Sequence, residues 1–132
     1  MKHLKSALSL FAAIAAVALA QPSDAQWLAP QVRMPGKGFF ASTARGKALF
    51  AKNCAECHGA DARGTPKGPP LLHPYYKPDH HSDYAFYAAI ETGTRQHHWQ
   101  FGDMPPVPKL GPDEAGHIIA YLRAEQRKVG LF

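Results

Sequence analysis

Cysteine and large apolar side chains are both scarce in this sequence of 132 residues. Two cysteines, Cys54 and Cys57, are too few to build the disulfide framework that stabilises many small exported domains. No apolar run reaches the roughly 20 residues that a membrane-spanning helix needs. The length leaves room for one small domain and excludes a multidomain enzyme.

The first 20 residues have the layout of a secretory signal peptide. Lys2 and Lys5 give a basic start, an apolar stretch occupies residues 7–20, and small side chains precede Gln21. We expect cleavage after residue 20 or after Ala25. The mature protein is then periplasmic or otherwise exported, and it has no transmembrane span.

The processed chain of 112 residues is short of core-forming side chains. Leu, Ile, Val and Phe number 19, about 17% of its residues, which is below the ~20% at which disorder becomes a concern. Its formal charge falls from +5 to +3, which is too low for a disordered chain and too weak to indicate a nucleic-acid partner. A large apolar cofactor would supply the missing core.

Helix-breaking residues and apolar periodicity divide the processed chain into helices and loops. Residues 21–41 are rich in proline and glycine and predict an extended lead-in. The capping residues and apolar stripes predict helices that begin at Ser42 or Thr43, at Ser82 and at Pro112. No stretch alternates with the two-residue period of a strand. We therefore predict an all-α domain of about three main helices, with long loops at 59–81 and 94–111.

The segment Cys54-Ala55-Glu56-Cys57-His58 carries the strongest functional signal. Two thiols separated by two residues can form thioethers to the two vinyl groups of one haem, and the next residue places an imidazole at the iron. One short segment thus supplies two covalent bonds and one axial ligand. The sequence predicts one haem c, covalently attached through Cys54 and Cys57, with His58 as an iron ligand.

Three other interpretations of the two cysteines are weaker. A disulfide between them would close a very small loop and add little stability. A thioredoxin-like dithiol would need a preceding strand and a βαβ pattern, which this sequence lacks. A structural zinc site would need two further ligands at a suitable spacing, and no second cysteine pair is present.

The sixth iron ligand is predicted to be Met104. Met1 leaves with the signal peptide and Met34 lies in the lead-in, whereas Met104 precedes two prolines that stiffen its loop. A thioether is a soft neutral donor that favours reduced iron. The alternative for this methionine is ordinary core packing.

Six further histidines of the processed chain leave two other questions open. His97 and His98 are close enough to Met104 in sequence to replace it and give iron with two histidine ligands. Adjacent histidines in loops could also hold copper or zinc. The plainer interpretation is that such a pair is solvated, stacks on Tyr75, Tyr76 or Trp99 and helps to wall the cofactor. The sequence leaves open the roles of the loop histidines, namely His73, His80, His81, His97 and His98.

In the order of its motifs the chain resembles class I monohaem c-type cytochromes. The resemblance covers about residues 41–131 and places a cytochrome c domain at 42–132. It rests on the following segments: Gly46 and Phe50, Cys54–His58, Gly68-Pro69-Pro70-Leu71, Met104-Pro105 and Ile118-Ile119-Ala120-Tyr121-Leu122.

The resemblance implies a cytochrome c-like fold and further residues around the haem. Gly46 would let the first and last helices cross closely. The Pro69 carbonyl would accept the second N–H of His58 and orient its ring, and Leu71 would pack on the haem. A histidine at position 73, where these proteins often have glycine, is a departure from the pattern.

Iron with both axial positions filled is suited to carrying single electrons rather than to catalysis. Its partners would be other exported or membrane-bound redox proteins in transient contact, and the chain could be a subunit of an oxidoreductase. Lys52, Arg63 and Lys67 flank the attachment segment and could steer an acidic partner. Two alternatives remain: a catalytic or sensing haem with a labile sixth ligand, and a histidine-rich protein that handles metal ions.

Overall fold

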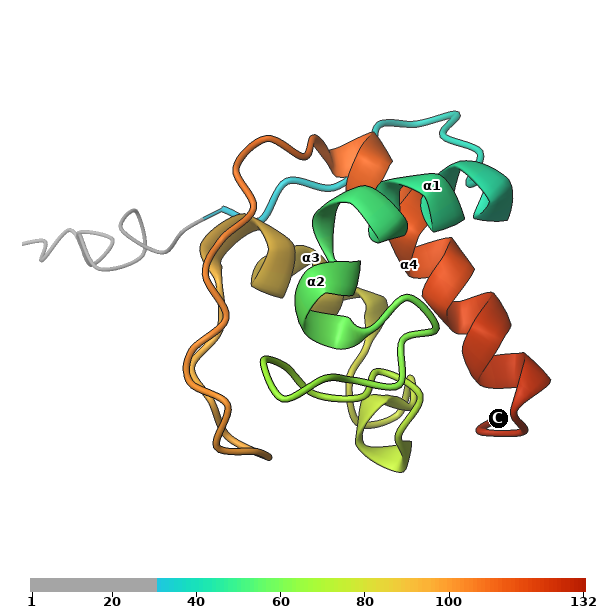
Figure 1. Cartoon of the computed structure of the whole chain (residues 1–132). Coiled ribbons are helices and arrows are strands. Elements are labelled where there is room, and N and C mark those ends of the chain that lie inside the picture. Colours follow the sequence, from blue (N-terminus) through green and yellow to red (C-terminus); the bar gives the residue numbers. More distant parts are fainter. Residues whose placement is uncertain (1–30) are drawn as a thin grey trace, which may run out of the picture.

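The computed structural model describes residues 31–132 (Figure 1). Within this range the chain forms no β-strand, which confirms the all-α prediction. The elements are four α-helices and one 3₁₀ turn, namely α1 (Thr43–Asn53), α2 (Ala55–His58), η2 (Pro74–Tyr76), α3 (Asp83–Thr92) and α4 (Pro112–Lys128). The predicted signal peptide and its cleavage sites lie outside the described residues. No helix among residues 31–132 combines the length and apolarity needed to span a membrane.

Helix α1 begins and ends where the sequence predicts. The Ser42 hydroxyl accepts a hydrogen bond from the Arg45 N–H at 3.3 Å and so caps the first turn. At the other end the Cys54 N–H donates to the Phe50 carbonyl. The backbone then bends at Cys54, and the one-turn helix α2 follows at an angle to α1 (Figure 1). The sequence did not predict this bend.

Helices α1 and α4 cross in close contact at Gly46, as the resemblance implies. A Cβ atom at Gly46 would lie 1.9 Å from the His117 carbonyl oxygen and 2.8 Å from the Tyr121 Cβ. One turn further along α1, the Phe50 ring packs against Tyr121 with 5.5 Å between ring centroids. Only glycine allows the two backbones to approach this closely.

Helix α3 carries an apolar face and ends at a glycine. Phe86, Tyr87 and Ile90 are buried, and Gly93 stops the helix with a φ of 75°. Ser82 occupies the N-cap position as predicted, but its side chain makes no capping hydrogen bond. The prediction of a side-chain cap is therefore wrong.

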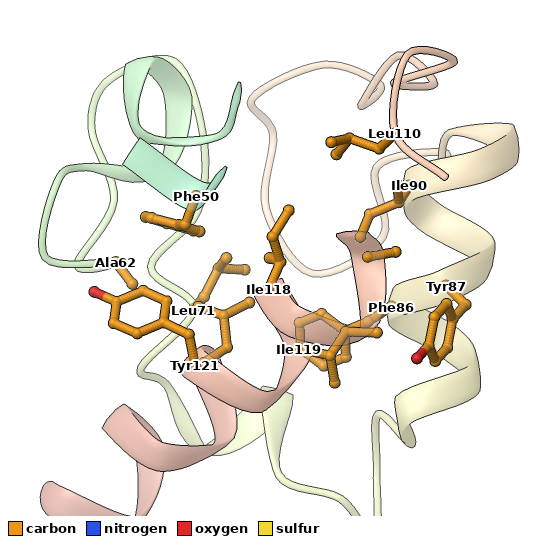
Figure 2. Close-up of a cluster of buried hydrophobic side chains, with 12 residues drawn as sticks. Phe50, Ala62, Leu71, Phe86, Tyr87, Ile90, Leu110, Ile118, Ile119 and Tyr121 are labelled. Carbon is orange, nitrogen blue, oxygen red and sulfur yellow. The ribbon is translucent and has the colours of Figure 1, made fainter. Parts of the chain in front are cut away.

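Helix α4 runs through the centre of the core. Pro112 lies in its first turn, and the Gly111 N–H donates to the Glu114 carboxylate at 2.8 Å. Figure 2 shows Ile118 and Ile119 between Phe50 on one side and Phe86 on the other. Side chains of α4 thus pack against both α1 and α3, and the three helices share one core.

A buried polar cluster joins α4 to the loop that precedes α3. Gln126 is fully buried, and its amide donates to the carbonyls of Leu71 and Tyr76 at 2.9 and 3.1 Å. The Arg123 guanidinium is also buried and donates to the carbonyls of Tyr76 and His81 and to the Asp83 carboxylate. These side chains satisfy loop carbonyls that would otherwise be buried without partners.

An ion pair joins Arg33 of the lead-in to α3. The Arg33 side chain donates to Glu91 at 2.5 Å, and its backbone N–H donates to the second carboxylate oxygen at 2.9 Å. The lead-in then turns between Gly36 and Phe39 before α1 begins.

Candidate functional site

A cavity of about 450 Å³ opens between α1, α2, α3 and the loops on either side of α3. Its volume lies within the usual range for small-molecule and cofactor sites. All six residues that the sequence predicts as cofactor-binding line this cavity, namely Cys54, Cys57, His58, Pro69, Leu71 and Met104. Most of the other lining residues are apolar, and these come from α1, α3, α4 and the loop between α3 and α4.

Helix α2 places the two thiols and the imidazole on one side of the chain. The N–H groups of Cys57 and His58 both donate to the Cys54 carbonyl, at 3.2 and 2.9 Å. Residues three and four apart in such a turn face the same direction. One helical turn therefore presents both sulfurs and one ring nitrogen to the cavity.

The His58 ring is buried and oriented by the backbone. Its Nδ1 lies 2.9 Å from the Pro69 carbonyl oxygen, the hydrogen bond that the resemblance implies. Nδ1 therefore carries the proton, and Nε2 has a free lone pair. Burial lowers the pKa of His58, and the hydrogen bond to the Pro69 carbonyl raises it by a smaller amount. A neutral imidazole with a fixed tautomer is the form that binds a metal ion.

The Cys54 thiol has the opposite character from a reactive redox cysteine. Burial, with a smaller contribution from Cys57, raises its pKa to about 11. Catalytic thiols in dithiol proteins have lowered pKa values, because the thiolate is the nucleophile. The environment of Cys54 therefore argues against the thioredoxin-like interpretation.

The loop after α2 packs directly on Cys57. A Cβ atom at Gly68 would lie 2.9 Å from the Cys57 carbonyl oxygen, so glycine is needed at this contact. The Thr65 hydroxyl donates to the same carbonyl at 2.7 Å. These contacts hold Pro69 in position to accept the hydrogen bond from His58.

Met104 is held by a backbone bridge that the sequence did not predict. Its N–H and carbonyl each form a 2.9 Å hydrogen bond with Thr94, so the two ends of the loop 94–104 are joined. The two arms of this loop run side by side in Figure 1. Gly93 makes the approach feasible, because a Cβ atom there would lie 2.6 Å from the Met104 carbonyl oxygen.

One buried polar atom at the cavity lacks a partner. The Trp99 Nε1–H is buried and makes no hydrogen bond within the described part of the chain. A buried donor without an acceptor is costly. A bound group with acceptor atoms, such as the carboxylates of haem, would satisfy it. This donor and the apolar walls both fit an amphipathic tetrapyrrole.

The histidines and aromatic residues of the two loops stack as expected. The His98 ring lies on Tyr75 with 4.3 Å between centroids and 20° between planes. His73 packs against Tyr75 and Trp99, and its Nδ1 accepts a hydrogen bond from the Tyr75 N–H at the start of η2. The residue that departs from the family pattern therefore has a structural role.

The basic residues near the attachment segment are mostly paired. Lys67 binds Glu56 at 2.8 Å, and Arg63 lies 3.6 Å from Asp61. Neighbouring acidic groups thus offset two of the three positive charges that the sequence suggests for steering an acidic partner. The structure gives little support to that suggestion.

The fold and the cavity define a class of protein. It is a small helical domain whose cavity is bordered by two cysteines, a buried histidine and a methionine, in a shape and polarity that suit a covalently bound haem.

Comparison with known proteins gives the family. The family model described as Cytochrome c matches residues 43–125, well over half of the chain, so this chain belongs to the cytochrome c family. Members of this family carry covalent haem c and transfer electrons.

Two relatives agree with this assignment. A stretch of 70 residues, 53% of this chain, is 41% identical to the Cbb3-type cytochrome c oxidase subunit CcoP of Rubrivivax gelatinosus. The chain spans only 19% of the length of that protein. The crystal structure of cytochrome CL from Methylophaga aminisulfidivorans matches 62% of this chain and 51% of its own, with a TM-score of 0.51 and 32% identity.

Proposed function

We propose that this protein is an exported monohaem cytochrome that passes single electrons between redox proteins. The observation that carries the proposal is that Cys54, Cys57, His58 and Met104 border the same cavity. The two thiols would hold haem c by thioether bonds, and His58 and Met104 would be its axial ligands. Haem iron supplies the one-electron chemistry.

The surrounding residues act by fixing these groups in place. The Pro69 carbonyl orients the His58 ring, and Thr94 holds the backbone of Met104. A rigid ligand pair keeps both oxidation states of the iron alike in geometry, which favours fast electron transfer. The apolar lining lowers the local dielectric and tunes the potential.

The arrangement of the loop histidines favours Met104 over His97 and His98 as the sixth ligand. The Nε2 atoms of His97 and His98 lie 3.2 and 3.3 Å from those of His81 and His80. These ring nitrogens are directed at other imidazoles, so both loops would have to rearrange before either could bind iron. The two backbone hydrogen bonds between Thr94 and Met104 hold the methionine in place. This argues against the open sixth iron position that a sensing haem needs.

Export and the choice of partners rest on the sequence and on one relative. The basic, apolar and small-residue pattern of residues 1–20 supports export. CcoP is by name a subunit of an oxidase. We therefore propose exported or membrane-bound redox proteins as donor and acceptor, met through small transient interfaces, and an electron-carrying rather than an enzymatic role for this chain.

The test is a comparison of two methionine variants of the mature holoprotein. Oxidised protein with His/Met ligation should show a weak near-red charge-transfer band. Met104→Ala should abolish that band and lower the midpoint potential, because a soft ligand is lost. Met34→Ala removes an exposed methionine of the lead-in and should change neither property.

Mass spectrometry completes the test, since it reports the haem adduct and the processed N-terminus together. A mature protein without a haem adduct would refute the proposal. A near-red band that survives in Met104→Ala, or carbon monoxide binding by the unaltered protein, would show that the sixth ligand is wrongly assigned.

A further inference from the structure

Four histidines from two loops converge at the haem cavity, and three of them, His81, His97 and His98, line it. His80 and His81 follow η2, and His97 and His98 lie in the loop that leads to Met104. One ring nitrogen from each of His80, His81 and His98 lies within 4.8 Å of the others. The His97 Nε2 lies 3.2 Å from the His81 Nε2, and the His80 and His98 Nε2 atoms are 3.3 Å apart. Two pairs of imidazole nitrogens therefore face one another.

Hydrogen bonds on the far side of two rings fix their tautomers. The Nδ1 of His81 lies 2.6 Å from the Tyr75 carbonyl oxygen, and the Nδ1 of His97 lies 2.8 Å from the Arg95 carbonyl oxygen. A carbonyl only accepts, so both Nδ1 atoms carry protons and both Nε2 atoms have free lone pairs when the rings are neutral.

Two lone pairs 3.2 Å apart repel each other unless a cation lies between them. The neutral His81–His97 pair therefore cannot be an ordinary N–H···N hydrogen bond. A metal ion satisfies both nitrogens at once.

The spacing suits tetrahedral coordination. With Zn–N bonds of about 2.0–2.1 Å, the nitrogens of a tetrahedral site lie roughly 3.3 Å apart. Both facing pairs are close to this separation. His97 contacts His81 but lies outside the group of three nitrogens that are within 4.8 Å of one another, so it would shift toward His80 and His98 to become the fourth ligand. Histidine ligands of zinc almost always donate their second N–H to a carbonyl or carboxylate, and His81 and His97 already do so.

The loop that carries His81 is fixed before any ion binds. The buried Arg123 guanidinium donates to the His81 carbonyl, and the ring of His98 is stacked on Tyr75. Little ordering of the chain would then be needed on binding, and this raises affinity.

We propose that His80, His81, His97 and His98 form a binding site for one divalent transition-metal ion of the zinc type. The ion would join residues 80–81 to residues 97–98 and so brace the loop that carries Met104. The proposal rests on the proposed function, because it needs Met104 rather than His97 or His98 as the sixth iron ligand.

The test uses the mature holoprotein after treatment with a chelator. Titration with Zn²⁺ should show one ion bound per chain. His81→Gln and His97→Gln should each weaken that binding by more than about tenfold, since each removes a ligand. His117→Gln is the control, because it removes a histidine of α4 that contacts none of the four and should leave affinity within about twofold. The haem absorption spectrum verifies that each variant is folded.

Zinc-edge X-ray absorption of the loaded protein then reports the ligands. The expected result is three or four imidazole nitrogens at about 2.0–2.1 Å. Zinc bound without imidazole, or bound equally well by the His81, His97 and His117 variants, would overturn the proposal. A parallel Cu²⁺ titration should follow the same order of variants, with tighter binding overall because nitrogen sites prefer Cu²⁺, and no binding of either ion would refute the proposal.

Discussion

At the scale of single residues, the position of Met104 depends on the absence of a side chain at Gly93. Gly93 ends α3 with a positive φ and lies against the Met104 carbonyl. Gly102, in the same loop, also has a positive φ, but a Cβ atom there would meet nothing within 4 Å. Alanine substitutions at these two glycines therefore separate two costs. Both substitutions strain the backbone, but only the one at Gly93 also creates a contact with the Met104 carbonyl.

Gly93→Ala should disturb Met104, whereas Gly102→Ala should not. Both substitutions impose strain of about 1–3 kcal/mol on a backbone that L-residues avoid. Only Gly93→Ala also pushes the Met104 backbone, so it should weaken the near-red band and lower the midpoint potential. Absorption spectroscopy and redox titration of both variants check this, and equal effects in the two variants would contradict it.

At the scale of elements, the crossing of α1 and α4 is the closest helix contact that we describe. Gly46 faces the backbone of α4, which cannot move aside without shifting the whole helix. Gly116 of α4 faces the Phe39 ring and the Tyr87 hydroxyl, and these side chains can rotate. Both glycines are helical, so alanine brings the same gain in helix propensity at each.

Gly46→Ala should therefore destabilise the protein far more than Gly116→Ala. We expect Gly46→Ala to cost about 3 kcal/mol or more, because the added methyl meets backbone atoms in a close-packed contact. Denaturant unfolding of both holoproteins gives the free energies of unfolding. If Gly116→Ala proves the more harmful, the crossing is not the tightest constraint.

At the scale of the whole molecule, polar links join segments that are distant in sequence. Arg123 connects α4 with the carbonyls of Tyr76 and His81 and with Asp83 at the start of α3. Arg33 connects the lead-in with Glu91 of α3. The Arg123 side chain is buried, whereas the Arg33–Glu91 pair is largely exposed. Substitutions of the two arginines should therefore affect the stability of the protein differently.

Arg123→Met should destabilise the protein by about 2–4 kcal/mol. Methionine retains much of the apolar volume but leaves the Tyr76 and His81 carbonyls without their donor. Arg127→Met, on the exposed end of the same helix, is the control and should have little effect. Unfolding measurements that find the two variants equal would show that the Arg123 cluster contributes no net stability.

The Arg33–Glu91 link should depend on pH in a defined direction. Hydrogen bonds from Arg33 hold the pKa of Glu91 below its ordinary value of 4.5. A group whose pKa is lower in the folded state stabilises the fold above its ordinary pKa, and this stabilisation is lost as the pH falls through the folded value.

Arg33→Gln should consequently lower stability at neutral pH but not in strong acid, where Glu91 is protonated in both proteins. Lys47→Gln, which removes the same charge from the exposed face of α1, should not show this pattern. Unfolding curves across the acid range, with an NMR titration of Glu91, would detect the change. A Glu91 pKa that stays the same in Arg33→Gln would contradict it.

The sequence by itself determined the three longer helices and the residues suited to attaching a haem. Capping residues, breakers and apolar stripes act over one or two turns, so Ser42, Ser82 and Pro112 marked helix starts that the structure confirms. The spacing of Cys54, Cys57 and His58 is likewise local, because one helical turn brings the three side chains together.

Only the tertiary structure decided which distant residues meet. The bridge between Thr94 and Met104, the carbonyls bound by Arg123 and the facing pair of His81 and His97 join residues 10 to 47 positions apart. No periodicity marks such contacts, because they depend on how helices pack and how loops close. The same local rules that place a helix therefore cannot show which loops hold the methionine or gather the histidines.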